Sequence, residues 1–277
     1  MNDAPRGLRV GADVFPYADV GRGRPILFLH AAPGDHRMWQ PHMALLADRW
    51  RCLAYTQRWF GTESWRPDGP PFGSATHATD LVNFVTALDI GPVALAAWSY
   101  SGHVALAAAL ARPDLFTSLF VYEPGFATYV TDPELLALFG EDATKVFAPI
   151  IESANEGDYE EAVRRLVDGS GGPGYFDREA EDRRRIHLDS AHVMPRLLSQ
   201  CAPVPISSED LASLQVRSLV SCGLKSRPVF LVTSRAAARS IGGIWHFELP
   251  LAGHFWPEEE PEEFANQLDI WLSRRPR

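Results

Sequence analysis

The most constraining feature of this chain is a serine that lies between a buried strand and a helix. Residues 93–97 are apolar without polar alternation, a pattern typical of a strand that is buried on both faces. Residues 104–111 are rich in alanine and are closely followed by Pro113, which predicts a helix that ends there. Ser99 falls between the two segments. The pattern therefore predicts a sharp strand-to-helix turn that presents the Ser99 hydroxyl, as in a nucleophile elbow.

The residues around Ser99 are small, as such a turn requires. Strand and helix pass close together there, and Ala97 and Ser101 occupy the two positions that are usually glycine, with Gly102 one step later. The same spacing also occurs in strand-to-helix turns whose serine has no chemical role. The motif alone leaves both interpretations open.

Strand and helix patterns alternate through the first 123 residues and return after residue 216. A hairpin is predicted over residues 8–20, with its turn at 21–23. Strands are predicted at 26–29, 51–55, 93–97, 118–122, 218–222 and 246–249, and helices at 38–50, at 76–88 and from Pro261 through Trp271. This alternation predicts an α/β fold with a mostly parallel, doubly wound sheet and helices on both faces.

Residues 124–216 break the alternation. Strand signals are scarce there, whereas Ser207 with Asp210 marks a helix start. We interpret 124–216 as an inserted helical cap, and residues 1–123 and 217–277 as the core that carries it.

The composition narrows the range of partners. The 277 residues carry a formal net charge of −9, which disfavours nucleic acid and anionic membrane surfaces. No run reaches about 18 consecutive apolar residues, and residues 1–10 lack the apolar block of a secretory signal. Cys52, Cys201 and Cys222 are widely spaced, which is typical of reduced thiols and makes the cytoplasm the expected compartment. The sequence carries no signal of oligomeric state.

A serine hydroxyl needs a base within hydrogen-bond reach to act as a nucleophile at neutral pH. Among the nine histidines, His254 follows a late predicted strand in a Gly-His turn just before the last helix. Loops at the carboxyl ends of the strands converge on one edge of such a sheet, so we expect His254 to face Ser99. The alternative is an ordinary surface histidine.

The loop at residues 30–34 follows the predicted strand at 26–29. Its backbone N–H groups can point at a reacting carbonyl oxygen, and we expect the amides of Ala32 and Tyr100 to form an oxyanion hole. The His30 imidazole is then expected to hold the loop by hydrogen bonds. The remaining histidines show no metal-ligand spacing with Cys, Asp or Glu and are interpreted as surface or core residues: His36, His42, His77, His103, His187, His192 and His246.

Four short motifs occur in a characteristic order. They are the His-Ala-Ala-Pro-Gly loop at 30–34, the Arg-Trp-Phe-Gly turn at 58–61, the elbow around Ser99, and Gly-His-Phe at 253–255. With these motifs the chain resembles the α/β-hydrolase-fold enzymes over essentially its whole length. The turn at 58–61 is similar to the Arg-Gly-x-Gly turn of that family.

The carboxylate expected to orient the histidine base does not occur at the position that is common in that family. Most members place it after the cap, in a Gly-x-x-Asp turn, but the corresponding turn at 223–226 ends in Ser226. Between residues 211 and 247 there is no Asp or Glu. Glu123, at the end of the predicted strand 118–122, lies where one branch of haloalkane dehalogenases and the zearalenone lactone hydrolases place a glutamate.

The resemblance therefore implies a triad of Ser99, His254 and Glu123. The alternatives for the acid are that Glu123 is only a charged loop residue, or that Asp114 takes its place. Asp114 follows Pro113 at the far end of the elbow helix, on the wrong side of the sheet.

The function that this resemblance implies is hydrolysis of a carboxylic ester or lactone through an acyl-enzyme, without a metal or organic cofactor, on a small and largely apolar substrate. Carbon–carbon bond hydrolysis, acyl transfer, cofactor-free oxygenation and non-catalytic ligand binding stay open on the same fold. A dehalogenase or epoxide hydrolase is disfavoured, because these enzymes need an aspartate where Ser99 stands. The residues expected to line a substrate pocket are Tyr100, Trp98, Trp59, Trp256 and His192.

Overall fold

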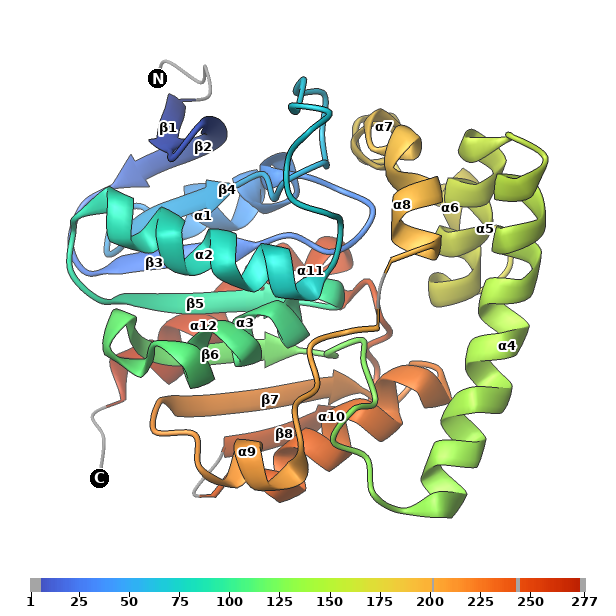
Figure 1. Cartoon of the computed structure of the whole chain (residues 1–277). Coiled ribbons are helices and arrows are strands. Elements are labelled where there is room, and N and C mark those ends of the chain that lie inside the picture. The colour runs from blue at the N-terminus through green and yellow to red at the C-terminus, as the bar shows by residue number, and fades with distance from the viewer. Residues whose placement is uncertain (1–5, 201, 243–244, 275–277) are drawn as a thin grey trace.

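Eight strands form one sheet in the computed structural model, which describes residues 6–200, 202–242 and 245–274 (Figure 1). In chain order the strands are β1 (Arg6–Val10), β2 (Asp13–Gly21), β3 (Pro25–Leu29), β4 (Arg51–Tyr55), β5 (Val93–Trp98), β6 (Phe116–Tyr122), β7 (Arg217–Gly223) and β8 (Trp245–Leu249). Their order in the sheet is β1-β2-β4-β3-β5-β6-β7-β8. The strands from β4 to β8 in this order are parallel, and β2 pairs antiparallel with β1 and β4. The predicted α/β class with a mostly parallel sheet is confirmed.

The first hairpin differs from the sequence prediction. β1 and β2 pair from Arg6 with Tyr17 to Val10 with Asp13, so the chain turns at residues 11–12 and not at 21–23. The predicted turn was wrong because the glycines at 21–23 mark a different bend, which leads from β2 into β3. Gly11 makes the actual turn with a φ of +61°, a conformation that glycine adopts without steric cost.

Helices cover both faces of the sheet, as a doubly wound fold requires. α2 (Ser74–Leu88) packs beside α3 (Tyr100–Ala111), and α1 (Gln40–Leu46) packs beside α12 (Pro261–Ser273) (Figure 1). The remaining helices of the core are α10 (Pro228–Ser240), α11 (Trp256–Glu259) and the 3-10 helices η1 (His36–Trp39) and η2 (Pro113–Leu115). None of the helices described is both long enough and apolar enough to cross a membrane.

The segment between β6 and β7 is helical, with no strand among its described residues. Its helices are α4 (Pro133–Asn155), α5 (Tyr159–Gly171), α6 (Tyr175–Arg178), α7 (Glu181–Asp189), η3 (Ala191–Val193), α8 (Met194–Leu198) and α9 (Ser208–Ala212). The predicted helix start at Ser207 and Asp210 is a reciprocal capping box. Helices α4 to α8 stand beside the end of the sheet toward which β6 and β7 point (Figure 1). The assignment of 124–216 as a separate cap stays a prediction.

The register of the central strands decides which residues meet at that end. Trp98 of β5 pairs with Tyr122 of β6, and Tyr122 in turn pairs with Ser221 of β7. β5 and β6 end at the paired residues Trp98 and Tyr122, so Ser99 and Glu123 leave the sheet side by side, whereas β7 continues to Gly223.

Candidate active site

Ser99 forms the turn between β5 and α3. Its backbone has φ +59° and ψ −124°, a conformation that is costly for a residue with a Cβ and is concentrated at functional positions. The Ser99 N–H donates a hydrogen bond of 2.9 Å to the Tyr122 carbonyl, which fixes the turn against the end of β6. The predicted strand-to-helix turn is therefore present, with the Ser99 side chain at the wall of a pocket.

The close approach that this turn requires falls on Gly102. A Cβ on Gly102 would lie 2.9 Å from the Cα of Pro124, inside the van der Waals limit. Ser101 has room for its side chain and uses it, because its hydroxyl donates to the His30 carbonyl and accepts a 2.7 Å hydrogen bond from Gln57 Nε2. These contacts tie the start of α3 to the loop after β3.

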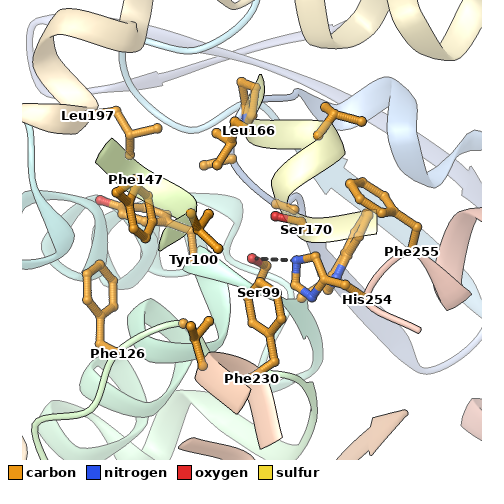
Figure 2. A pocket seen from close by; sticks show the side chains of 18 of the residues that line it. Ser99, Tyr100, Phe126, Phe147, Leu166, Ser170, Leu197, Phe230, His254 and Phe255 are labelled. Carbon is orange, nitrogen blue, oxygen red and sulfur yellow. Dashed lines mark hydrogen bonds between the residues drawn. The ribbon is translucent and has the colours of Figure 1, made fainter. Parts of the chain in front are cut away.

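His254 lies next to Ser99, as expected from its place after β8. Its Nε2 is 3.1 Å from the Ser99 Oγ, and the two side chains face each other in Figure 2. The ring of Phe230 stacks on the imidazole, with the ring centroids 3.6 Å apart and the planes at 8°. The Tyr122 hydroxyl donates a 2.6 Å hydrogen bond to the Gly253 carbonyl, which anchors the loop that carries His254.

Glu123 is fully buried at the end of β6 and contacts the other side of the same imidazole. Its Oε2 accepts a 2.7 Å hydrogen bond from the Nδ1 of His254. Its Oε1 accepts from the Gly223 N–H at 2.8 Å and from the Ser226 hydroxyl at 2.6 Å. Both carboxylate oxygens of Glu123 thus accept hydrogen bonds. One of the donors is Ser226, which stands where most α/β-hydrolase-fold enzymes carry their acid.

Asp114, the alternative candidate for the acid, lies at the protein surface and not in the buried site of Ser99 and His254. Asp114 lies in η2, at the other end of α3, and its exposed carboxylate pairs with Arg112 at 2.6 Å. It is a surface ion pair.

The loop after β3 carries the backbone amides expected to receive an oxyanion. Ala32 and Tyr100 both line the pocket that Ser99 lines. Tyr100 is the first residue of α3, so its N–H has no acceptor within the helix.

His30 behaves as expected of a residue that anchors this loop. Its Nδ1–H donates to the Ala31 carbonyl at 2.8 Å, and its Nε2 accepts from the Gln57 N–H at 3.0 Å. Burial lowers the pKa of His30 to about 4, so the ring is neutral at physiological pH.

The pocket at Ser99 has a volume of about 120 Å³ and a mostly apolar wall. Of the residues predicted to line it, Trp98 and Tyr100 do so. The Tyr100 hydroxyl donates a 2.7 Å hydrogen bond to Nδ1 of His77, whose Nε2–H donates to the Arg58 carbonyl. This contact orients the Tyr100 ring along the pocket.

Three other predicted pocket residues lie elsewhere. The Trp59 indole donates to the Pro70 carbonyl and lines a separate depression. His192 donates from Nε2 to the Trp59 carbonyl at 3.0 Å. Trp256 packs against Tyr122, behind the site. Trp59 and Trp256 were predicted from their nearness in sequence to site loops, and His192 from its place in the predicted cap. None of the three is among the residues that line the pocket.

Most of the pocket wall comes from residues that the sequence did not single out. Residues 139–200, from the helical segment between β6 and β7, supply a mostly apolar wall with three polar side chains, made of Phe139, Val146, Phe147, Leu166, Val167, Ser170, His187, Leu197 and Gln200. Figure 2 labels Phe147, Leu166, Ser170 and Leu197 among them. Leu166 and Ser170 are four residues apart in α5 and so share one helix face. Such a face is visible in the sequence, but which surface it covers is a tertiary property.

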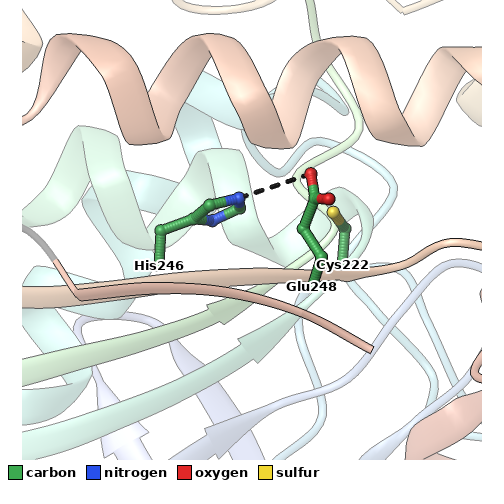
Figure 3. A group of neighbouring side chains, drawn as sticks. All are labelled: Cys222, His246 and Glu248. Carbon is green, nitrogen blue, oxygen red and sulfur yellow. Dashed lines mark ion pairs between the residues drawn. The ribbon is translucent and has the colours of Figure 1, made fainter. Parts of the chain in front are cut away.

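Two clusters in the described residues combine a histidine with further metal-ligating side chains. One, shown in Figure 3, is Cys222, His246 and Glu248 at the β7–β8 pair. The carboxylate of Glu248 is taken by Arg235 at 2.6 Å. Burial, followed by the nearby Glu123 and Glu248 carboxylates, raises the pKa of the Cys222 thiol to about 12, so the thiol stays protonated. This cluster is a poor metal site. The other is Glu179, His187 and Glu258.

Comparison with known proteins places the chain in a family. Residues 26–267 match the alpha/beta hydrolase family. Among curated relatives, the non-heme chloroperoxidase CPO-A1 of Kitasatospora aureofaciens is 36% identical over 95 residues, and the alignment covers 34% of each chain. The chain therefore aligns with only about a third of the length of that relative.

Two further similarities extend over the whole chain. A haloalkane dehalogenase of Agrobacterium fabrum is 25% identical over 92% of this chain and 86% of its own. The crystal structure of an enol-lactonase from Burkholderia xenovorans superposes with a TM-score of 0.75 at 19% identity, over 97% of this chain and all of the other. The structural likeness shows a shared fold, and the family match over residues 26–267 shows that this chain belongs to the alpha/beta hydrolase family.

Proposed function

We propose that this chain is a serine hydrolase that cleaves carboxylic esters or lactones through an acyl-enzyme, with Ser99, His254 and Glu123 as its triad. The observation that carries the proposal is the hydrogen-bonded path from the Ser99 Oγ through the imidazole to the Glu123 carboxylate, at 3.1 Å and 2.7 Å. A serine nucleophile needs a base in reach of its hydroxyl and an acid that orients the base, and this path supplies both.

In the proposed reaction the Ser99 Oγ forms a bond to the substrate carbonyl carbon while its proton passes to His254 Nε2. Glu123 holds the proton on Nδ1, which leaves Nε2 free to accept, and stabilises the imidazolium that forms. The tetrahedral intermediate then expels the alkoxide, which takes the proton from Nε2. Water attacks the acyl-enzyme by the same route in reverse, and releases the acid and free Ser99.

The negative charge of the tetrahedral intermediate requires nearby donors. The N–H groups of Ala32 and Tyr100 are the proposed pair, because both residues line the pocket and the Tyr100 amide begins a helix. The partial positive charge at the start of α3 favours an anion at this point.

The wall of the pocket supports an uncharged, apolar substrate. No lysine or arginine occurs among the described residues that line it. Leu166, Leu197 and Phe147 face a space of about 120 Å³, on the scale of the roughly 150 Å³ engineered cavity that admits one benzene ring. A substrate carboxylate would meet no lysine or arginine here, and the imidazole of His187 already faces Glu179 and Glu258, which argues against carbon–carbon hydrolases that act on acidic substrates.

The relatives bear on the reaction class. The dehalogenase likeness does not transfer as an activity, because Ser99 stands where that chemistry needs an aspartate. Lactone cleavage has a precedent on this fold in the Burkholderia enol-lactonase. The proposal therefore includes lactones without excluding open esters.

The test combines a fluorophosphonate probe with p-nitrophenyl esters. The proposal expects the probe to label Ser99, and Ser99→Ala to lose labelling and to lower the hydrolysis rate by a factor on the order of 10⁶ with folding intact. Ser170→Ala is the matched control, since this hydroxyl also lines the pocket, and it should keep labelling. An unlabelled Ser99 in folded protein would support a binding protein instead. Labelling without ester or lactone turnover would support acyl transfer or another reaction.

A further inference from the structure

Glu179, His187 and Glu258 come together from three separate helices. Glu179 directly follows α6 as its C-terminal cap, His187 lies in the last turn of α7, and Glu258 lies in α11, four residues after His254. The first two helices belong to the segment between β6 and β7, whereas α11 belongs to the core. The cluster therefore connects the helical segment to the loop that carries the proposed base.

The side chains of this cluster are buried, with exposed fractions of 3%, 2% and 5%. Across the described part of the chain, no hydrogen-bond partner reaches either carboxylate oxygen of Glu179, the Nε2 of His187 or the Oε2 of Glu258. Buried carboxylates without partners are costly, because no water replaces the lost solvation. Four such atoms at one point indicate a ligand that all of them share.

The spacing of these atoms suits coordination of one ion. His187 Nε2 lies 3.5 Å from Glu179 Oε1 and 3.8 Å from Glu258 Oε2, and all the donor atoms lie within 4.8 Å of one another. Ligands at about 2.1 Å from a tetrahedral zinc ion lie roughly 3.4 Å apart. The separation of the first pair needs to change by only about 0.1 Å, and the widest separation by at most about 1.4 Å, to complete this geometry.

The tautomer of His187 is set for a metal. Its Nδ1–H donates a 2.8 Å hydrogen bond to the Pro33 carbonyl, which turns the Nε2 lone pair toward the two carboxylates. Histidines that bind metals characteristically donate their other N–H to a carbonyl or carboxylate in this way.

We propose that Glu179, His187 and Glu258 bind one divalent transition-metal ion, with zinc as the best match to an imidazole and two carboxylates. The charge of the cluster supports this. Two carboxylates buried at one point attract positive charge. A proton on His187 leaves one net negative charge buried, whereas a divalent ion on a neutral imidazole neutralises both carboxylates.

A metal ion could reach the cluster from the surface, and its binding would stabilise a loop of the active site. Glu258 also lines a surface depression of about 280 Å³, beside Arg183 and Pro261, whereas His187 lines the pocket of Ser99. The cluster thus lies between solvent and the active-site pocket. Through the Pro33 carbonyl, an ion on His187 would hold the loop that carries the Ala32 amide.

The experiment titrates Zn²⁺ into chelator-treated, tag-free full-length protein against a chromophoric competitor, and follows thermal unfolding with and without Zn²⁺. The proposal expects one ion per chain and a higher Tm with the ion. Glu179→Gln/Glu258→Gln keeps the side-chain volume and should lose both effects. His246→Gln, in the cluster of Figure 3, is the matched control and should keep both.

Cobalt substitution in the unaltered protein makes the test independent of how the variants fold. The expected visible spectrum is that of nitrogen and oxygen ligation. A thiolate-to-cobalt charge-transfer band would place the ion at Cys222 and overturn the proposal. Failure to bind Zn²⁺ or Co²⁺ would also overturn it and leave protonated His187 as the counter-charge. Neither outcome depends on whether Ser99 reacts.

Discussion

The Ser226 hydroxyl donates a 2.6 Å hydrogen bond to Oε1 of Glu123, although the two residues follow different strands. The strands are β6 and β7, which are parallel neighbours, so the loops after them reach the same point beside His254. Ser226 stands at the position from which most of the family supplies the acid. The two acid positions are therefore neighbours, and the carboxylate at one accepts a hydrogen bond from the small hydroxyl at the other.

Removing this hydroxyl should weaken the acid without abolishing it. In Ser226→Ala, Oε1 keeps only the Gly223 N–H, and a hydrogen bond to a charged group contributes about 1.5 kcal/mol or more, so we expect kcat to fall roughly tenfold at constant KM. Steady-state hydrolysis of a p-nitrophenyl ester measures both constants. Ser221→Ala is the control, since its buried hydroxyl has no hydrogen-bond partner in the described residues. Equal kcat values for the two variants would contradict the role of Ser226.

Moving the acid to the other position should restore part of the activity. Glu123→Ser removes the carboxylate and is expected to lower kcat by a factor on the order of 10⁴. Adding Ser226→Asp places a carboxylate on the β7 side of the same imidazole, and we expect a recovery of about 100-fold in kcat. If the double variant is no faster than Glu123→Ser, the two loops do not serve one site.

Gly102 should be intolerant of a single added carbon. The Cβ of Gly102→Ala would meet the Pro124 Cα at 2.9 Å, and backbone cannot yield as a flexible side chain can, so we expect a loss of about 1–3 kcal/mol in the free energy of unfolding. Gly140→Ala is the counterpart, because a Cβ there meets nothing within 4 Å and α4 gains about 0.5–1 kcal/mol from alanine. Urea unfolding of both variants checks the pair, and a stabilised Gly102→Ala would contradict the close approach.

The width of the pocket should depend on α4. Phe147 lines the pocket, whereas Leu138, on the same helix and similarly exposed, is outside its wall. For an ester with a long acyl chain, Phe147→Ala should raise KM about fivefold, since roughly 1 kcal/mol of apolar contact is lost. Leu138→Ala should leave KM unchanged. The measurement is a series of p-nitrophenyl esters of increasing acyl length, and a uniform change across the series would show that α4 does not select acyl size.

The sequence predicted the fold and the central trio of side chains because their signals are local or topological. Ser99 and His254 each follow a strand, and parallel strands deliver the residues after them to one edge whatever the details of packing. Glu123 was predicted because the loop after β7 contains no acid, and because the resemblance to one branch of haloalkane dehalogenases and to zearalenone lactone hydrolases implies a glutamate at this strand end. The contact between Ser226 and Glu123 was not predicted, because it depends on two loops that are about 100 residues apart.

The pocket was predicted less well. Trp59 and Trp256 are close in sequence to site loops, but the pocket is walled by helices of the segment between β6 and β7, whose orientation no local pattern specifies. The cluster at His187 was missed for the same reason. Glu179 and His187 have no metal-ligand spacing with Glu258 in the sequence, and only the packing of α7 against α11 unites them.

Acid should destabilise the fold through histidines that are buried in the neutral form, and His103 allows a clean measurement. Burial outweighs the hydrogen bond from Nε2–H to the Val204 carbonyl and lowers the pKa of His103 to about 4. In the unfolded chain the pKa is about 6.5, so between pH 6.5 and 4 the unfolded state binds more protons and the free energy of unfolding decreases as the pH falls. Above pH 7 both states are neutral and His103 contributes no pH dependence. Between pH 7.5 and 5.5 the expected loss in the free energy of unfolding from this residue is about 1 kcal/mol.

Urea unfolding of the unaltered chain and of His103→Gln at both pH values isolates this contribution, because all other titrating groups are common to the two proteins. If the variant loses as much stability as the unaltered chain over this range, His103 is protonated in the folded state and its burial does not hold the ring neutral.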